Sequence, residues 1–193
     1  MLCSFPQALG AADMTGAGEK ERGLYKILVV GLGNPDRGDD GIGAAVIQSL
    51  TGRLPPDVAL LMKRGDILSL IEEWSGINAL ICVDASAPMG TPGRIHRIDA
   101  AAGISPSDVS FTSSHAFGLA EVIALGQTLQ LLPEVAIVYA IEGATFDNGA
   151  PMTPIVAAAA RDVANRIVVE VERLRQNPIS IVSGDPNIKG SRK

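Results

Sequence analysis

The sequence is poor in the features that mark several large classes of protein. Its two cysteines, Cys3 and Cys82, lie in unrelated contexts, which leaves little room for a disulfide framework and suits a reducing compartment. Lysine and arginine total 16 against 21 aspartate and glutamate, and no basic block offers a surface for nucleic acid. No apolar run reaches the roughly 20 residues that a membrane helix needs, and the N-terminus lacks the order of a signal peptide. We therefore expect a cytoplasmic protein with neither a nucleic-acid nor a membrane partner.

Several motifs of common enzyme classes are also missing. There is no G-x-S-x-G, and neither serine nor cysteine stands at a strand-to-helix elbow. With two histidines in the chain, a Ser-His or Cys-His arrangement has few possible bases. The stretch GLGNPDRG does not match the G-x-G-x-x-G dinucleotide fingerprint, and a P-loop lysine is absent. These absences argue against a nucleophilic hydrolase and a nucleotide-binding enzyme.

The chain does have enough apolar residues to form the hydrophobic core of one domain. It is 193 residues long and 47% hydrophobic, which favours a single globular unit with a substantial core. Residues 1–23 show no period and are rich in small residues, so we expect a loose leader. The polar, Pro- and Gly-punctuated residues 176–193 are expected to form a tail, which leaves residues 24–175 as the single α/β domain.

Within that domain, apolar strands alternate with helices. Strands are expected at residues 26–30, 58–62, 79–83, 94–98 and 135–141, the fourth being an edge strand. Helices are expected at residues 41–50, 67–74 and 115–125, with a last one that opens at Thr153-Pro154. This order predicts a three-layer α/β sandwich around a mostly parallel, twisted, five-stranded sheet with helices on both faces.

The most informative stretch is ILVVGLGNPDRGDDGIGAAVIQSL at residues 27–50. Its glycines indicate backbone that bends sharply or lies close to something else, and we interpret them as room for another protein's chain. The turn delivers Asp39 and Asp40 to the start of a helix. Such a pair can hold a cation, pair with Arg37 or cap the helix, and the residues alone leave all three open.

Other polar residues are expected at the same sheet edge, because the loops leave the carboxyl ends of parallel strands there. Asp84 ends the third strand in ICVDAS, and His115 opens a helix in FTSSHAFGLAE. Asp66 follows the second strand, and Glu142 ends the last one. Each has an ordinary structural explanation as a cap, turn or loop residue. Together, two carboxylates and one imidazole form a donor set that suits nickel, cobalt, zinc or iron.

At this point the residues resemble a known family. GLGNPDRGDDGIG after a strand, VDAS after a later strand and SSHAFGLAEVIAL opening a helix occur in the order of the [NiFe]-hydrogenase maturation proteases. The resemblance implies a twisted sheet with helices on both sides (phosphorylase/hydrolase-like) and a metal-dependent endopeptidase. That enzyme would remove the C-terminal extension of a hydrogenase large-subunit precursor once nickel has been inserted.

The resemblance also assigns residues. The family's three metal-binding positions correspond to Asp40, Asp84 and His115, which we expect to be catalytic, with nickel supplied by the precursor and other divalent metals acting as mimics. Asp39 would then cap the helix or pair with Arg37. We expect substrate contacts from a set of residues around this edge, namely Gly33, Asn34, Arg37, Asp39, Asp66 and Glu142.

Two other functions fit parts of the pattern. A recognition or chaperone domain could bind the same nickel site without cutting. Peptidyl-tRNA hydrolases also open with a strand and a G-L-G-N-P-like turn, but a histidine-asparagine pair follows it there, and this chain has Arg37-Gly-Asp-Asp-Gly instead. The segment after the second strand reads R-G-D, where some maturation proteases have a D-G-G-T-like turn. That departure leaves the identity of the precursor open.

Overall fold

The computed structural model describes residues 25–102 and 118–176. Five strands form one sheet in the order β2-β1-β3-β5-β4, with β4 antiparallel to β5 and the other pairs parallel. The strands are β1 (Ile27–Leu32), β2 (Val58–Lys63), β3 (Ala79–Ser86), β4 (Ile95–Asp99) and β5 (Val135–Glu142). The mostly parallel sheet and its edge strand are as predicted.

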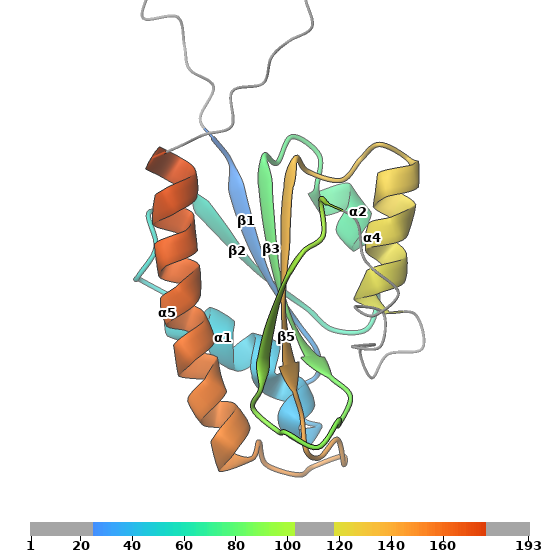
Figure 1. The fold of residues 1–193 in the computed structure, drawn as a ribbon, viewed down its shortest axis with the longest axis vertical. Helices are drawn as coiled ribbons and strands as arrows, with labels where there is room; N and C mark the ends of the chain where they lie inside the picture. Colours follow the sequence, from blue (N-terminus) through green and yellow to red (C-terminus); the bar gives the residue numbers. More distant parts are fainter. Residues whose placement is uncertain (1–24, 103–117, 177–193) are drawn as a thin grey trace, which may run out of the picture.

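Helices cover both faces of this sheet, which confirms the three-layer sandwich (Figure 1). They are the 3-10 turn η1 (Gly38–Gly41) and the helices α1 (Ile42–Leu50), α2 (Leu70–Glu73), α4 (Leu119–Thr128) and α5 (Pro154–Gln176). α1 and α5 lie on one face, and α2 and α4 lie on the other (Figure 1). None of the described helices is long and apolar enough to span a bilayer.

Each face of the sheet has its own hydrophobic core, because neighbouring residues of a strand point in opposite directions. In β3, Ile81 and Val83 belong to the core under α1 and α5. Leu80 and Cys82 belong to the core under α2 and α4. The Cys82 thiol is fully buried, and burial raises its pKa, with a smaller contribution from the charge of Asp84. It acts as a small apolar residue.

Most elements begin and end within two residues of the expected positions, and three elements differ by more. β3 continues past Asp84, because Ala85 and Ser86 pair with the end of β5, so Asp84 lies within the strand rather than after it. α2 is a single turn, because its hydrogen bonds run mostly from a residue to the third residue before it. α4 begins at Leu119, after a Gly118 of extended backbone conformation. The helix start expected at His115, the leader 1–23 and the tail beyond residue 176 lie outside the described residues.

Candidate functional site

The glycines of the β1–η1 turn are packed against this chain's own backbone. Gly33 has a φ of +110°, and a Cβ on it would lie 2.0 Å from the backbone oxygen of Asp40. A Cβ on Gly31 would lie 2.4 Å from the backbone oxygen of Gly43, so these two glycines bring α1 directly against β1. The interpretation of these glycines as room for another protein's chain is therefore wrong. Their role is to fold the turn tightly enough to place Asp40 under the sheet edge.

Asp40 is fully buried at that edge, within η1. Its Oδ2 accepts a hydrogen bond from the backbone N–H of Asn34 at 3.0 Å. The Arg37 guanidinium lies 3.8 Å from the same oxygen, with about a third of its own side chain exposed. Burial of a carboxylate costs free energy unless hydrogen-bond donors or positive charges lie next to it. For Asp40 both the donor and the positive charge come from the preceding turn, through Asn34 and Arg37.

Asp84 lies close to Asp40, on β3, which is the strand next to β1 in the sheet. Because Val83 and Ala85 face the core under α1 and α5, the Asp84 side chain faces the opposite side of the sheet, where α2 and α4 lie. It is 3% exposed, and burial raises its pKa to about 7. The N–H of Ala85, donating to Oδ1 at 2.9 Å, works against that shift, while the negative charge of Asp40 adds to it. The neighbouring carboxyl group of Asp40 thus adds to the effect of burial and disfavours the ionised form of Asp84.

Asp39 points elsewhere, although it is equally buried. Its two oxygens accept hydrogen bonds from the backbone N–H groups of Ala144, Thr145 and Thr153, at 2.8, 3.2 and 2.7 Å. They also accept from the Thr153 hydroxyl. The expected helix cap or ion pair with Arg37 is wrong, since neither η1 nor α1 has a side-chain cap and Arg37 faces Asp40. Asp39 fastens the β1–η1 turn to the β5–α5 loop.

Glu142 and Asp66 also bind backbone of this chain. The Glu142 side chain is buried, and its Oε1 accepts from the N–H groups of Met89 and Thr91, both at 2.6 Å. Burial would raise the pKa of Glu142, but these backbone donors together lower it below its usual range. Asp66 is exposed, and its Oδ1 accepts from the N–H of Ser69 at the start of the α2 turn. The hydrogen bonds of both side chains shape loops, and their expected contact with substrate stays a prediction.

A pocket of about 380 Å³ opens next to the Asp40 turn. It is lined by Asn34, Asp36, Arg37, Arg64 and Gly65. Asn34 and Arg37 were expected to contact substrate, whereas Arg64 was not singled out, because an arginine after a strand carries no sequence motif. Arg64 and Asp36 form an exposed ion pair at 3.5 Å across the pocket. The pocket joins the loop after β1 to the loop after β2, at the edge where Asp40 is buried.

The third predicted ligand, His115, lies outside the described residues. Within residues 25–102 and 118–176 there is no group of three or more His, Cys, Asp or Glu side chains that could hold a metal ion. The structure therefore brings two of the three predicted ligands together and does not test the triad. His115 precedes α4, which packs on the face of the sheet toward which Asp84 points. The expected common edge thus holds for Asp40 and Asp84.

Several solved structures are similar to the chain in fold. A [NiFe] hydrogenase maturation protease HycI from Thermococcus kodakarensis is 20% identical, with a TM-score of 0.62, covering 78% of this chain and 95% of its own. The hydrogenase maturating endopeptidase HybD from Escherichia coli is 21% identical, with a TM-score of 0.62, over 77% and 93%. An endopeptidase from Escherichia coli is 23% identical, with a TM-score of 0.64, over 79% and 93%. No curated protein matches the chain.

The family model described as hydrogenase maturation protease (HycI) matches residues 49–170. The matched part makes up more than half of the chain and includes Asp84 and His115, while Asp40 lies just before it. The expectation drawn from the three ordered motifs is confirmed at the level of family and fold. The chain belongs to the hydrogenase maturation protease family, whose members are endopeptidases that hydrolyse peptide bonds.

Proposed function

We propose that this protease removes the C-terminal extension of a [NiFe]-hydrogenase large-subunit precursor after nickel has been inserted. Asp40, Asp84 and His115 would act together at the nickel ion that the precursor carries. The observation that supports this most directly is the burial of Asp40 and Asp84 side by side at the carboxyl edge of the sheet. A buried carboxyl group whose pKa is raised by burial and by a neighbouring carboxylate, as for Asp84, is typical of catalytic and metal-binding sites.

The chemistry of the donor set fits a borderline divalent ion. Two carboxylates and one imidazole suit nickel, and also the ions that would serve as mimics, such as cadmium. A bound cation would favour the ionised form of Asp84, whose pKa burial raises to about 7. In this proposal the metal belongs to the substrate, and it polarises the scissile carbonyl or activates a water when the precursor is bound.

The chain's own residues would hold and orient the precursor. Asn34 fixes Asp40 through its backbone N–H, and Arg37 offers a guanidinium between that carboxylate and the adjoining pocket. We infer that the pocket accepts part of the precursor next to the scissile bond. Gly33 has a supporting role, because the backbone of Asp40 occupies the space that a side chain at this position would need.

The test is processing of a nickel-loaded precursor by single variants, followed by mass spectrometry at the precursor's C-terminus. We expect Asp40→Asn, Asp84→Asn and His115→Ala each to slow cleavage by about a hundredfold or more, as removal of a catalytic group does. Asp162→Asn is the matched control, because Asp162 is exposed on α5. Its cleavage rate should equal that of the wild type, and the nickel-free precursor should stay uncut.

Two outcomes would contradict the proposal. If any two of the three variants cleave at the wild-type rate, the assignment of the triad is wrong. If the wild type forms a stable complex with nickel-loaded precursor and no mass is lost, the chain recognises the nickel site without cutting it.

A further inference from the structure

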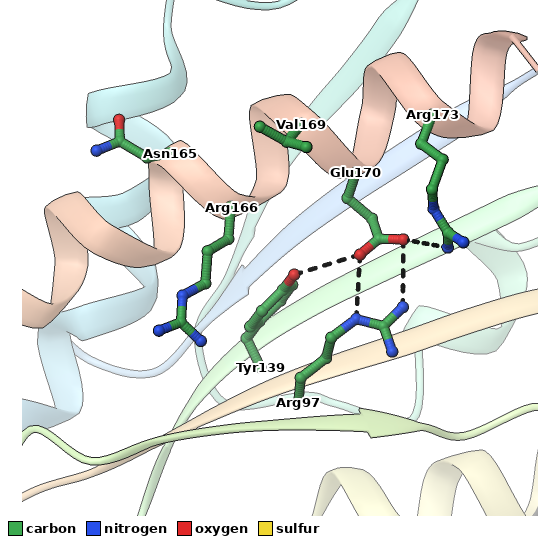
Figure 2. Close-up of a pocket in the computed structure, with 7 residues that line it drawn as sticks. All are labelled: Arg97, Tyr139, Asn165, Arg166, Val169, Glu170 and Arg173. Carbon is green, nitrogen blue, oxygen red and sulfur yellow. Dashed lines mark hydrogen bonds and ion pairs between the residues drawn. The ribbon is translucent and has the colours of Figure 1, made fainter.

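A second pocket lies between α5 and the β5–β4 edge of the sheet. It measures about 450 Å³ and is distinct from the pocket beside Asp40. Figure 2 shows its lining residues, which are Arg97, Tyr139, Asn165, Arg166, Val169, Glu170 and Arg173. Three of them are arginines and one is a glutamate, so the lining carries two positive charges in excess within a chain whose net charge is −5.

Two of the arginines are held by Glu170. Arg97 donates to both Glu170 oxygens, at 3.0 and 3.2 Å, and Arg173 donates to one of them (Figure 2). Burial would raise the pKa of Glu170, but these guanidinium groups outweigh it and the pKa is lowered. The Tyr139 hydroxyl lies 3.5 Å from the same carboxylate. This network, centred on the nearly buried Glu170 carboxylate, ties β4 and β5 to α5 and fixes one wall of the pocket.

Arg166 forms the opposite wall, one turn before Glu170 on α5. In Figure 2 its side chain extends toward the sheet, on the other side of Tyr139 from Arg97. Burial raises the pKa of Tyr139, and the positive charges of Arg97 and Arg166 oppose that shift, so both act on the same ring. Within the described residues, Arg166 makes no hydrogen bond or ion pair with a carboxylate. The pocket therefore presents a guanidinium with capacity for an anion.

This pocket is not an extension of the candidate active site. Tyr139 pairs in register with Val83, and both side chains face the core under α1 and α5. Asp84, the next residue of β3, points to the opposite side of the sheet. An anion in the pocket would thus lie across the sheet from Asp84, where it could take part in binding but not in cleavage.

We propose that this pocket binds an acidic segment of the precursor, with a carboxylate received by the Arg166 guanidinium. The inference rests on the proposed function for the identity of the partner, and on the charge of the pocket for its chemistry. A planar guanidinium pairs with a carboxylate through two parallel N–H groups. One small pocket in an acidic chain does not suit a nucleic-acid backbone, which needs a run of basic residues. Val169, 64% exposed beside the arginines, adds an apolar contact for the same segment.

The test uses Arg166→Glu, with Arg161→Glu as its matched control, because Arg161 is an exposed arginine of the same helix outside the pocket. In precursor processing we expect Arg166→Glu to raise KM about fivefold or more and to leave kcat unchanged, since a charged contact at a partly exposed site is lost and reversed. Arg161→Glu should leave both constants at the wild-type values. Unchanged KM in Arg166→Glu, with normal cleavage by the wild type, would overturn this inference and leave the proposed function intact.

A second measurement does not depend on cleavage. End-blocked tetraglutamate, added to the full-length protein, should shift the amide resonances of residues 165–173, while end-blocked tetraglutamine should not. The shifts should disappear in Arg166→Glu and persist in Arg161→Glu. If the wild type failed to cut any precursor but gave these shifts, the anion pocket would stand and the proposed function would fall. If a short single-stranded DNA shifted these resonances more strongly than tetraglutamate, the assignment to a protein carboxylate would be wrong.

Discussion

Replacement of Asp39 tests whether the β1–η1 turn depends on a loop more than a hundred residues away in the chain. The Asp39 carboxylate is fully buried and accepts from three backbone N–H groups and one hydroxyl of the β5–α5 loop. In Asp39→Ala these donors lose this acceptor, and the alanine side chain supplies none in its place. We therefore expect a large loss of stability, although Asp39 contacts no catalytic group in our proposal.

The magnitude follows from the two shortest contacts. The N–H groups of Thr153 and Ala144 donate at 2.7 and 2.8 Å in part-buried hydrogen bonds, and each such bond to a charged carboxylate contributes about 1–2 kcal/mol. Their sum predicts a loss of about 2–4 kcal/mol in the free energy of unfolding, a large share of the ~5–15 kcal/mol of an ordinary domain. Asp39→Asn should recover only part of this, because its NH2 group faces at least one N–H whichever way the amide is turned.

Urea unfolding followed by circular dichroism measures the effect. With a slope of about 2 kcal/mol per molar urea, the midpoint of Asp39→Ala should fall by roughly 1–2 M. Asp162→Ala on the exposed face of α5 is the control, and its midpoint should stay within a few tenths of a molar of the wild type. Hydrogen exchange should show faster exchange at Ala144 and Thr153. A midpoint shift below about 0.3 M in Asp39→Ala, or full stability in Asp39→Asn, would refute the role given to this carboxylate.

Three further predictions concern neighbouring positions. Gly33→Ala places a Cβ 2.0 Å from the Asp40 backbone oxygen at a φ of +110°, so this variant should unfold at a far lower urea concentration than the wild type. Gly52→Ala is the control, because Gly52 also has a positive φ but no atom lies near the added Cβ, and its free energy of unfolding should fall by only about 1 kcal/mol. Burial raises the pKa of Asp84 to about 7, so the folded state keeps this proton over a pH range in which the unfolded chain loses it. With chelator present, the free energy of unfolding should therefore fall by up to about 4 kcal/mol as pH rises from about 4 to 7, and this dependence should be absent in Asp84→Asn. The pKa of Glu142 is lowered despite its burial, so its stabilisation is present above its usual pKa and lost as pH falls; Glu142→Gln should cost about 1 kcal/mol at pH 7, and this difference should shrink in acid.

Much of the fold can be predicted from the sequence because the strands of this sheet are buried on both faces. The run ALICV at residues 79–83 is apolar throughout, and it forms the first five residues of β3, with a core on each side of the sheet. The helix α5 begins at Pro154, after Thr153, as the N-cap and proline positions predict. In both cases the residues nearby in the sequence decide the outcome.

Local patterns are less informative where pairing partners decide a boundary. Asp84 has the residue type of a turn, yet β3 continues for two more residues because β5 is long enough to pair with them. The apolar spacing at residues 67–74 is typical of a longer helix than α2. There the hydrogen bond from Ser69 to the Asp66 side chain and the short-range backbone bonds form turns instead. The periodicity of a segment therefore predicts neither the length of a strand nor the type of a turn.

The different contacts of Asp39 and Asp40 show why only part of the candidate site could be predicted from the sequence. The two residues are adjacent and equally buried, and both stand in a turn shaped by the same glycines. What separates them is the β5–α5 loop, whose N–H groups converge on Asp39 and bind both of its oxygens. With Asp39 bound in this way, its neighbour Asp40 is turned toward Arg37 and the carboxyl group of Asp84. Since consecutive side chains of a helical turn point in different directions, a loop that fixes one aspartate also aims the other, and the site depends on residues 144–153 as much as on its own motif.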